Sequence, residues 1–292
     1  MKGKLILPYI MTNMLTGFGS AIMFWRSGYD PIWIGTFFAT FTLPFFLMVL
    51  AGALGISKTS KNLPAIQVVN LAAVTFVAFI LFSRGGPAST AEYASIGLAI
   101  YGALTMQWYI HIFSKYGRKP SATTISGMVL PELQLYDLDR SKVSSADFVG
   151  DKTLLVFFRA NWCPFCMNQL KDVKAQAERL AAAGVKVKFI SNQGFKNSEK
   201  LAKKLNLPAH FEILQDRDLR AAKTLGIQDI GGAPSGMPGY PNDTVMATVI
   251  ALDEQGKVIF GDETDNYRRR PHPDTFLHVF ETGEADTRMA AE

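Results

Sequence analysis

Residues 154–166 read LLVFFRANWCPFC. The apolar run at 154–158 has the length of a strand, and a continuous apolar run is typical of a strand buried on both faces of a sheet. Pro164 suits the first position of a helix, whose apolar stripe runs to Leu180, and Gly184 suits its C-terminal end. The stretch therefore predicts a buried central strand, a following helix, and two cysteines at their junction.

The positions of Cys163 and Cys166 favour redox chemistry. A thiolate at a helix N-terminus faces unpaired backbone N–H groups and the positive end of the helix dipole, which lower its pKa. Because the second sulfur follows three residues later, the pair can close a disulfide, so one thiolate attacks a substrate and its neighbour resolves the product. Pro164 is compatible with this geometry, and we expect Trp162 to cover part of the site.

Two other roles are open to the cysteine pair, namely half of a zinc site or inert core thiols. A zinc site needs further ligands, but the sequence holds only two cysteines and no second CxxC. The four histidines show no ligand spacing with one another or with the pair: His111, His210, His272 and His278. We therefore predict a redox centre that requires no metal and no organic cofactor.

Residues 120–282 are predicted to form one α/β domain, with a disordered tail at 283–292. Beyond the opening strand and helix, strands are expected at 185–190, 211–214, 244–252 and 257–260, and helices at 197–205, 218–225 and 274–281. The order β-α-β-α-β-α-β-β-α predicts parallel strands first and an antiparallel hairpin near the end.

Residues 1–119 differ in composition from the rest of the chain, with nine Lys or Arg and only two acidic residues. They contain four apolar stretches without any Lys, Arg, Asp or Glu. The stretches cover residues 5–25, 32–56, 64–82 and 94–113. Since a helix needs about 20 residues to cross a bilayer, we predict a bundle of four transmembrane helices over 1–119. The sequence pI of about 9.1 arises from this half, where basic residues flank apolar runs, and this argues against nucleic acid as a partner.

The distribution of Lys and Arg between the connectors predicts the orientation in the membrane. Seven lie at the N-terminus, in the second loop and after the fourth stretch, and two lie in the first and third loops. Because basic residues collect on the cytoplasmic side, we expect a protein integral to the plasma (inner) membrane, with its redox domain in the cytoplasm. The alternative is an extracytoplasmic reductase.

Residues 125–282 resemble the AhpC/TSA (redoxin) branch of the thioredoxin-like superfamily. The resemblance rests on DFVGDK at 147–152, WCPFC at 162–166, AGVKV at 183–187, QD at 215–216 and LGI at 225–227. It implies a thioredoxin-like fold with the cysteine pair as the redox centre.

The resemblance implies two different reactions, and the sequence departs from both patterns. Peroxiredoxins place a Pro and a Thr or Ser seven and three residues before the peroxidatic Cys. If that Cys is Cys166, these places hold Arg159 and Cys163. The Arg that peroxiredoxins usually place before a late strand falls near Met246, so Arg159 is the candidate donor to a peroxide.

In the thioredoxin pattern Cys163 is the nucleophile and Cys166 the resolving thiol. The buried acid of thioredoxins is replaced by Phe157, and their cis-Pro falls near Ala247 or Thr248. Both cysteines of the dithiol are nevertheless present.

We therefore predict a membrane-anchored thiol–disulfide oxidoreductase that uses Cys163 and Cys166, supported by Trp162, Pro164 and Arg159. Its expected partners are the lipid bilayer, protein disulfides or peroxides as substrates, and a thiol electron donor. One alternative is a peroxiredoxin-like peroxidase in which Cys166 is peroxidatic. Another is a non-enzymatic sensor in which oxidation of the pair changes the packing of the bundle.

Two further segments carry expectations of their own. The loop at 228–243 is rich in Gly and Pro, and the fold resemblance places its end beside the cysteine pair. The run Arg268-Arg269-Arg270 is interpreted as a solvated charge run, with contact to anionic lipid as the alternative.

Overall fold

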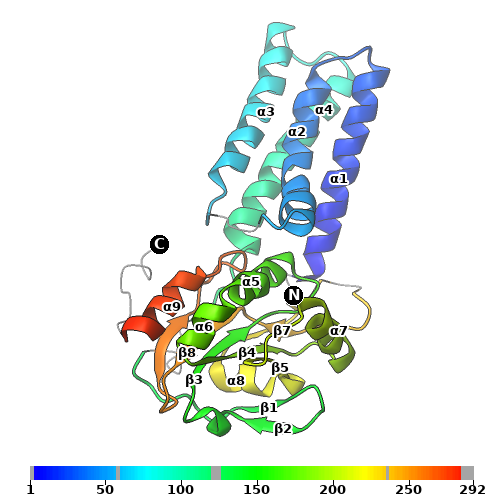
Figure 1. Ribbon diagram of the computed structural model, residues 1–292. Coiled ribbons are helices and arrows are strands. Elements are labelled where there is room, and N and C mark those ends of the chain that lie inside the picture. Colours follow the sequence, from blue (N-terminus) through cyan, green and yellow to red (C-terminus); the bar gives the residue numbers. More distant parts are fainter. Residues whose placement is uncertain (1–2, 57–59, 120–125, 235–236, 284–292) are drawn as a thin grey trace. The chain divides into compact units, whose positions relative to one another are not determined.

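The computed structural model describes residues 3–56, 60–119, 126–234 and 237–283 (Figure 1). The chain forms two compact units, and the boundary between them lies between Lys115 and Tyr116. Residues 116–119 therefore belong with the second unit, a few residues before the boundary predicted at 119/120. The tail predicted to be disordered lies, from residue 284 on, outside the described residues.

The first unit contains the four predicted apolar helices. They are α1 (Gly3–Arg26), α2 (Ile32–Phe45), α3 (Pro64–Ser83) and α4 (Thr90–Trp108), and π-helical turns extend α2 over Phe46–Ala53 and α4 over Tyr109–Phe113. Each helix is long and apolar enough to cross a membrane. In α2 the π-helical turns follow Pro44, which has no N–H to donate and disturbs the regular helical ladder.

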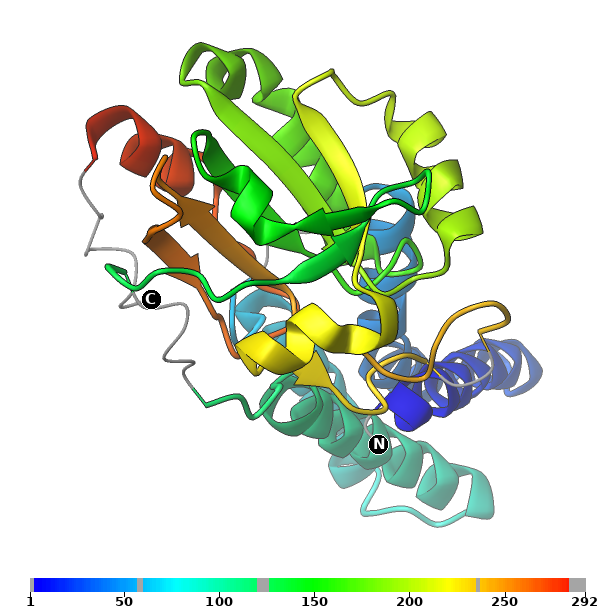
Figure 2. The same ribbon diagram turned by 90° about the horizontal axis from the view of Figure 1, so that it is seen from below.

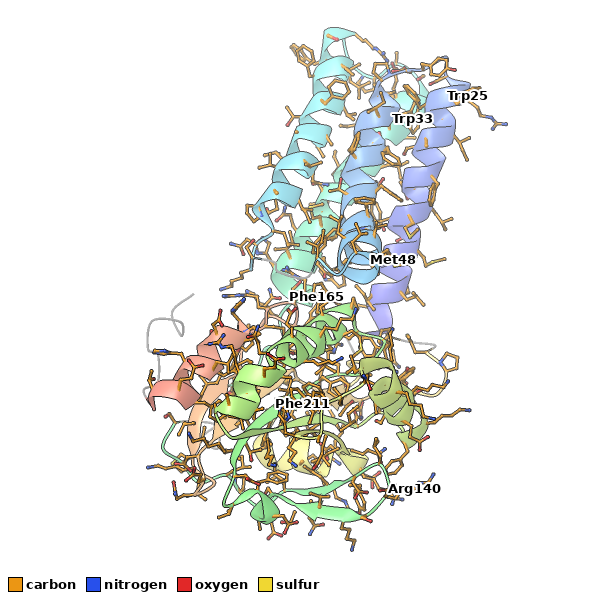
Figure 3. The ribbon with its side chains drawn as sticks, in the orientation of Figure 1. Trp25, Trp33, Met48, Arg140, Phe165 and Phe211 are labelled. Carbon is orange, nitrogen blue, oxygen red and sulfur yellow. The ribbon has the colours of Figure 1, made fainter. Side chains whose placement is uncertain are left out.

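Polar side chains inside this unit bond to neighbouring helices. Asn70 Nδ2 donates to the Ala39 carbonyl at 2.7 Å, and the Thr36 and Ser95 hydroxyls lie 2.7 Å apart. Such hydrogen bonds pair polar groups that would be costly to leave without a partner in an apolar environment. The two tryptophans that flank the first connector differ, since Trp25 of α1 is exposed and Trp33 of α2 is buried among the helices (Figure 3).

The second unit is built on a seven-stranded sheet of order β2-β1-β5-β4-β3-β8-β9. The parallel centre consists of β3 (Lys152–Phe157), β4 (Val185–Ser191) and β5 (Phe211–Gln215). The antiparallel strands are β1 (Gln134–Tyr136), β2 (Lys142–Ser144), β8 (Thr248–Leu252) and β9 (Val258–Asp262). The predicted parallel centre and late antiparallel hairpin are confirmed, and β3 is the buried central strand.

Helices cover both faces of this sheet, as in a thioredoxin-like α/β domain. The helices are α5 (Pro164–Ala175), α6 (Ala177–Ala182), α7 (Phe195–Leu205), α8 (Arg220–Leu225) and α9 (Pro273–Thr282). Figures 1 and 2 show α5, α6 and α9 on one face and α8 on the other. Alternate side chains of β3 point to opposite faces, and Leu155 and Phe157 pack in one core cluster with Leu225 of α8.

Two of the predicted elements are divided in the structure. The helix expected from Pro164 to Gly184 is divided at Gln176, whose N–H donates to the Val173 carbonyl three residues earlier. The strand expected at 244–252 is interrupted at residues 246–247, because Met246 N–H donates to the Ile227 carbonyl instead of continuing one ladder. Its first part, β7 (Thr244–Val245), pairs with β6 (Gln228–Asp229) inside the predicted loop.

Candidate active site

The connection from β3 to α5 is held by side chains of neighbouring segments. The Arg159 carbonyl accepts hydrogen bonds from Ser191 Oγ at 3.2 Å and Thr244 Oγ1 at 2.8 Å. Asn161 N–H donates to Gln193 Oε1 at 2.9 Å. These partners come from the end of β4, the residues after it, and β7, so the folded sheet fixes the path of residues 159–162.

The two cysteines lie where the sequence predicts them, at the start of α5. Cys163 is the N-cap residue with extended backbone, Pro164 occupies the first helical turn, and Met167 N–H donates to the Cys163 carbonyl at 3.0 Å. Pro164 fits because a first-turn N–H has no helical acceptor. Both thiols are free, with 1% exposure for Cys163 and 0% for Cys166.

The two thiols are hydrogen-bonded to each other and differ in acidity. Burial alone raises the pKa of Cys166, but the hydrogen bond from Cys163, the Arg270 guanidinium, and the backbone N–H and guanidinium of Arg159 together lower it well below the ordinary thiol value. Burial raises the pKa of Cys163, as do its hydrogen bond to Cys166 and the Cys166 charge, and both arginines oppose this rise. These surroundings therefore favour ionisation of Cys166 over ionisation of Cys163.

One cation that contacts the pair is Arg270, in the segment before α9. Its Nη2 lies 3.6 Å from Cys166 Sγ, and its Nη1 donates to the Tyr267 and Arg269 carbonyls at 2.6 Å each. The interpretation of residues 268–270 as a solvated charge run is wrong for two of the three, because Arg268 is buried and Arg270 contacts the Cys166 sulfur.

The second cation is Arg159, which lies between two aromatic rings. Its guanidinium carbon is 4.8 Å from the ring centroid of Trp162 and 5.2 Å from that of Tyr267. Its Nη2 lies 3.8 Å from Asp229 Oδ2 and donates to the Gly232 carbonyl. Trp162 thus contacts the guanidinium of Arg159, and the two cation–π contacts hold this group in place.

Two N–H groups of the arginines that act on the thiols have no hydrogen-bond partner in the described part of the chain. Among the described residues, Nε of Arg159 and Nε of Arg270 are buried and have no hydrogen-bond partner. Buried N–H groups are normally paired, and an unpaired one is costly. The site is therefore suited to a small molecule with oxygen acceptors.

The loop at 228–243, predicted to end beside the cysteine pair, contacts the segment that leads to the pair. In addition to the Arg159 contacts of Asp229 and Gly232, Tyr240 Oη donates to Asn161 Oδ1, and Asn197 Nδ2 donates to the Gly239 carbonyl at 3.2 Å. Residues 235–236 of this loop are outside the described residues. The loop thus stabilises the segment from which Cys163 and Cys166 project.

The predicted supporting residues Arg159, Trp162 and Pro164 all lie at the pair. The sequence prediction missed Arg270, and it also missed Tyr267, whose ring contacts the Phe165 ring edge-on at 5.8 Å (Figure 3 labels Phe165). Both lie about a hundred residues further along the chain, and no local pattern distinguishes them from other surface residues. In the described part of the chain, no group of three His, Cys, Asp or Glu is placed to hold a metal ion.

Comparison with known proteins identifies the family of this unit. Residues 127–260 match the model of the AhpC/TSA family. This part of the chain is an AhpC/TSA domain. The predicted resemblance is therefore confirmed, and with it the prediction of an oxidoreductase that works through thiols.

Relatives of the AhpC/TSA domain include peroxiredoxins. Peroxiredoxin Bcp of Escherichia coli K12 is 27% identical over 155 residues, which cover 52% of this chain and 93% of that protein. Chloroplastic peroxiredoxin Q of Triticum aestivum is 31% identical over 118 residues, which cover 40% of this chain and 54% of that protein. Among solved structures, peroxidoxin BcpB of Mycobacterium tuberculosis matches with a TM-score of 0.44 and 19% identity, over 53% of this chain and 96% of that one.

Proposed function

We propose that this chain is a membrane-anchored thiol peroxidase in which Cys166 attacks the peroxide and Cys163 resolves the product. The observation that carries the proposal is the contact between Arg270 Nη2 and the buried Cys166 Sγ at 3.6 Å. A cation at this distance favours the thiolate form of Cys166. The peroxiredoxin relatives support the same reaction.

The reaction follows from the two thiols in sequence. The Cys166 thiolate attacks the terminal oxygen of a hydroperoxide, the O–O bond breaks, and the products are a sulfenic acid on Cys166 and an alkoxide, which takes up a proton. The Cys163 thiol then loses its proton and attacks the sulfenic sulfur, which releases water and forms the Cys163–Cys166 disulfide. An external dithiol donates two electrons and two protons to restore both thiols.

Arg159 and Arg270 suit the first step. Their unpaired Nε groups lie beside the thiols and are free to donate to the peroxide oxygens. Donors that are already oriented stabilise the charge that develops on the leaving oxygen. Arg159 thus replaces the donor that the peroxiredoxin pattern places elsewhere. Burial of both thiols further favours a substrate much smaller than a protein disulfide.

Thiol–disulfide exchange with Cys163 as nucleophile is the second candidate. It is favoured by the position of Cys163 at the N-cap of α5, where the helix dipole acts on it. The raised pKa of Cys163 opposes it. The two reactions therefore differ in which thiol is reactive at neutral pH.

The four apolar helices are proposed to anchor the domain in a bilayer, with the domain on the cytoplasmic side of the plasma membrane. Support comes from the length and composition of the helices and from the distribution of Lys and Arg between their connectors. A redox sensor remains the non-enzymatic alternative, and it predicts oxidation of the pair without turnover.

The proposal is tested with the full-length chain and its Cys163→Ser and Cys166→Ser variants. The wild type should consume peroxide continuously with dithiothreitol as reductant. Without reductant, Cys163→Ser should consume one equivalent and accumulate a sulfenic acid that dimedone traps on Cys166, whereas Cys166→Ser should consume none. Iodoacetamide at pH 7 should label Cys166 before Cys163 in the wild type.

Two results would contradict the peroxidase. Preferential labelling of Cys163, together with insulin reduction that is lost in Cys163→Ser, would assign thiol–disulfide exchange. A wild type that forms the disulfide once but turns over neither peroxide nor insulin would assign the sensor.

A further inference from the structure

Asp265, in the segment between β9 and α9, is bound to residues that follow the fourth apolar helix. Its carbonyl accepts a hydrogen bond from Tyr116 N–H at 2.7 Å. Its Oδ1 accepts two more, from Gly117 N–H at 2.7 Å and from Arg118 N–H at 3.0 Å. We call these three hydrogen bonds the Asp265 anchor. Three consecutive backbone N–H groups thus hold both the main chain and the side chain of one residue.

The other side of the anchor is itself fixed to the central sheet. Tyr116 Oη accepts a hydrogen bond from Ala247 N–H at 3.1 Å, and Arg118 Nη2 donates to Thr248 Oγ1 at 2.9 Å. Thr248 pairs with Phe157, the last residue of β3. Because the path to the cysteines leaves the sheet directly after Phe157, the anchor ties the segment after β9 to the end of the strand that leads to the cysteine pair.

Beyond the anchor the segment continues as a turn that is held by its own hydrogen bonds. Asn266 is buried, its Oδ1 accepts from Arg268 N–H, and its carbonyl accepts from Arg269 N–H, both at 3.0 Å. The carbonyl of Arg269 accepts from Arg270 Nη1 at 2.6 Å, and Arg270 Nη2 lies 3.6 Å from Cys166 Sγ. A continuous series of contacts therefore connects the anchor with the cation beside the thiol.

The same turn carries Tyr267, which contacts both arginines of the site. Its carbonyl accepts from Arg270 Nη1 at 2.6 Å, and its ring centroid lies 5.2 Å from the guanidinium carbon of Arg159. The ring also contacts the ring of Phe165, which lies between the two cysteines in the chain, edge-on at 5.8 Å. A displacement of the turn would therefore disturb both cations that act on Cys166.

We propose that Asp265 is a positioning residue of the active site, which holds the turn at 266–270 so that Arg270 faces Cys166. The inference rests on the proposed function only for the assignment of Cys166 as the attacking thiol. Both sides of the anchor lie outside the matched family segment at 127–260. The residues that link the domain to the apolar helices are thus part of the framework of its active site.

The test compares the full-length wild type with Asp265→Ala by the pH midpoint for alkylation of Cys166 by iodoacetamide. Without the anchor Arg270 is free to turn away, so we expect the midpoint to rise by about 1 unit or more. We also expect kcat/KM for hydrogen peroxide to fall about tenfold or more. Removal of the Asp265 charge alone would lower the midpoint, because a nearby negative charge disfavours a thiolate. A rise therefore reports displacement of the cation.

Two further variants separate positioning from a loss of stability. Asp265→Asn removes the charge but keeps an oxygen that can accept both N–H groups, so it should return the midpoint to near the wild-type value. Asp253→Ala is the matched control, because Asp253 Oδ1 also accepts two backbone N–H groups, from Gln255 at 3.0 Å and Lys257 at 2.8 Å. It lies in the turn between β8 and β9, at the end of β8 opposite Thr248. Asp253→Ala should lower the melting temperature and leave the midpoint unchanged.

The midpoint is informative because every variant retains the charged and titratable groups that act on Cys166. These groups are Cys163 of α5, Arg159 after β3 and Arg270 before α9. The acidic neighbours of Asp265 around Arg118, namely Asp262 and Glu263, are also retained.

The proposal is wrong if Asp265→Ala has the wild-type midpoint or a lower one, whatever its melting temperature. If Asp265→Ala does not fold, amide hydrogen exchange of the wild type gives the answer. Protection of the Gly117 and Arg118 amides supports the anchor, and exchange as fast as in an unstructured peptide contradicts it. These results are distinct from failure of the proposed function, because the midpoint for Cys166 can be measured in a chain that reduces no peroxide.

Discussion

In the proposed peroxidase, Arg270 favours the thiolate form of Cys166. Its guanidinium contacts Cys166, and the carbonyl groups of Tyr267 and Arg269 hold it there. An opposite charge at this distance lowers the pKa of a thiol by about 1–3 units. Since the thiolate is the nucleophile, the rate of alkylation follows the fraction of Cys166 that is ionised.

In Arg270→Met we therefore expect the pH midpoint for alkylation of Cys166 to rise by about 1–3 units. The wild type, with its lowered pKa, should react at full rate near pH 7 and lose reactivity only as the pH falls through that pKa. The variant should lose reactivity at a higher pH, so it should be slower than the wild type at pH 7. Iodoacetamide kinetics followed by mass spectrometry measure both curves.

Arg220→Met is the matched control for this prediction, because Arg220 is exposed on α8. Its curve should coincide with that of the wild type. If Arg270→Met also coincided with the wild type, the low pKa of Cys166 would have to come from its hydrogen bond with Cys163 and from Arg159.

The site residues that the sequence predicts are those that are close to the cysteines in the chain. Arg159, Trp162 and Pro164 lie within a few residues of the pair, so the geometry of one strand and one helix is enough to place them. Arg270 reaches the site from the far end of the domain, through the path of the chain after β9. That arrangement depends on the order of the strands in the sheet, which no local pattern encodes.

At the level of elements, β3, β4 and β5 are predicted well because each is a largely apolar run buried in the sheet. The hairpin of β1 and β2 has only three residues in each strand and a mixed burial pattern, so hydrophobic periodicity gives no sign of it. The interruption after β7 was also missed, because it depends on Met246 pairing with the distant Ile227.

The loop at 228–243 yields a prediction at the same scale. A Cβ atom at Gly232 would overlap the carboxylate of Asp229 and the methyl group of Thr244. Gly232→Val should therefore displace Asp229 and the Gly232 carbonyl from Arg159, with a loss of about 1–3 kcal/mol in the free energy of unfolding. Peroxide reduction should fall with it, because Arg159 loses two of its partners.

Thermal unfolding and peroxide turnover of the full-length chain check this prediction. Gly194→Ala is the control, since a Cβ atom there meets nothing within 4 Å. An unchanged melting temperature and turnover in Gly232→Val would mean that the loop does not hold Arg159 in place.

For the whole molecule, the side of the membrane on which the redox domain lies determines which reductant can supply electrons to its cysteine pair. A domain in the cytoplasm has access to the thiols that keep cytosolic cysteines reduced, whereas one outside requires its own donor. The seven Lys and Arg residues on the side of both termini, against two on the other, favour the cytoplasm.

Protease treatment of sealed vesicles tests this orientation. In inverted vesicles of the inner membrane, the domain after Lys115 should be cleaved, and in intact spheroplasts it should be protected. Because the two termini share one side in a bundle of four crossings, a tag before α1 should show the same accessibility. Protection in inverted vesicles with cleavage in spheroplasts would place the Cys163–Cys166 pair outside. Its reductant would then have to be delivered across the membrane, and the bundle contains no cysteine to carry those electrons as thiols.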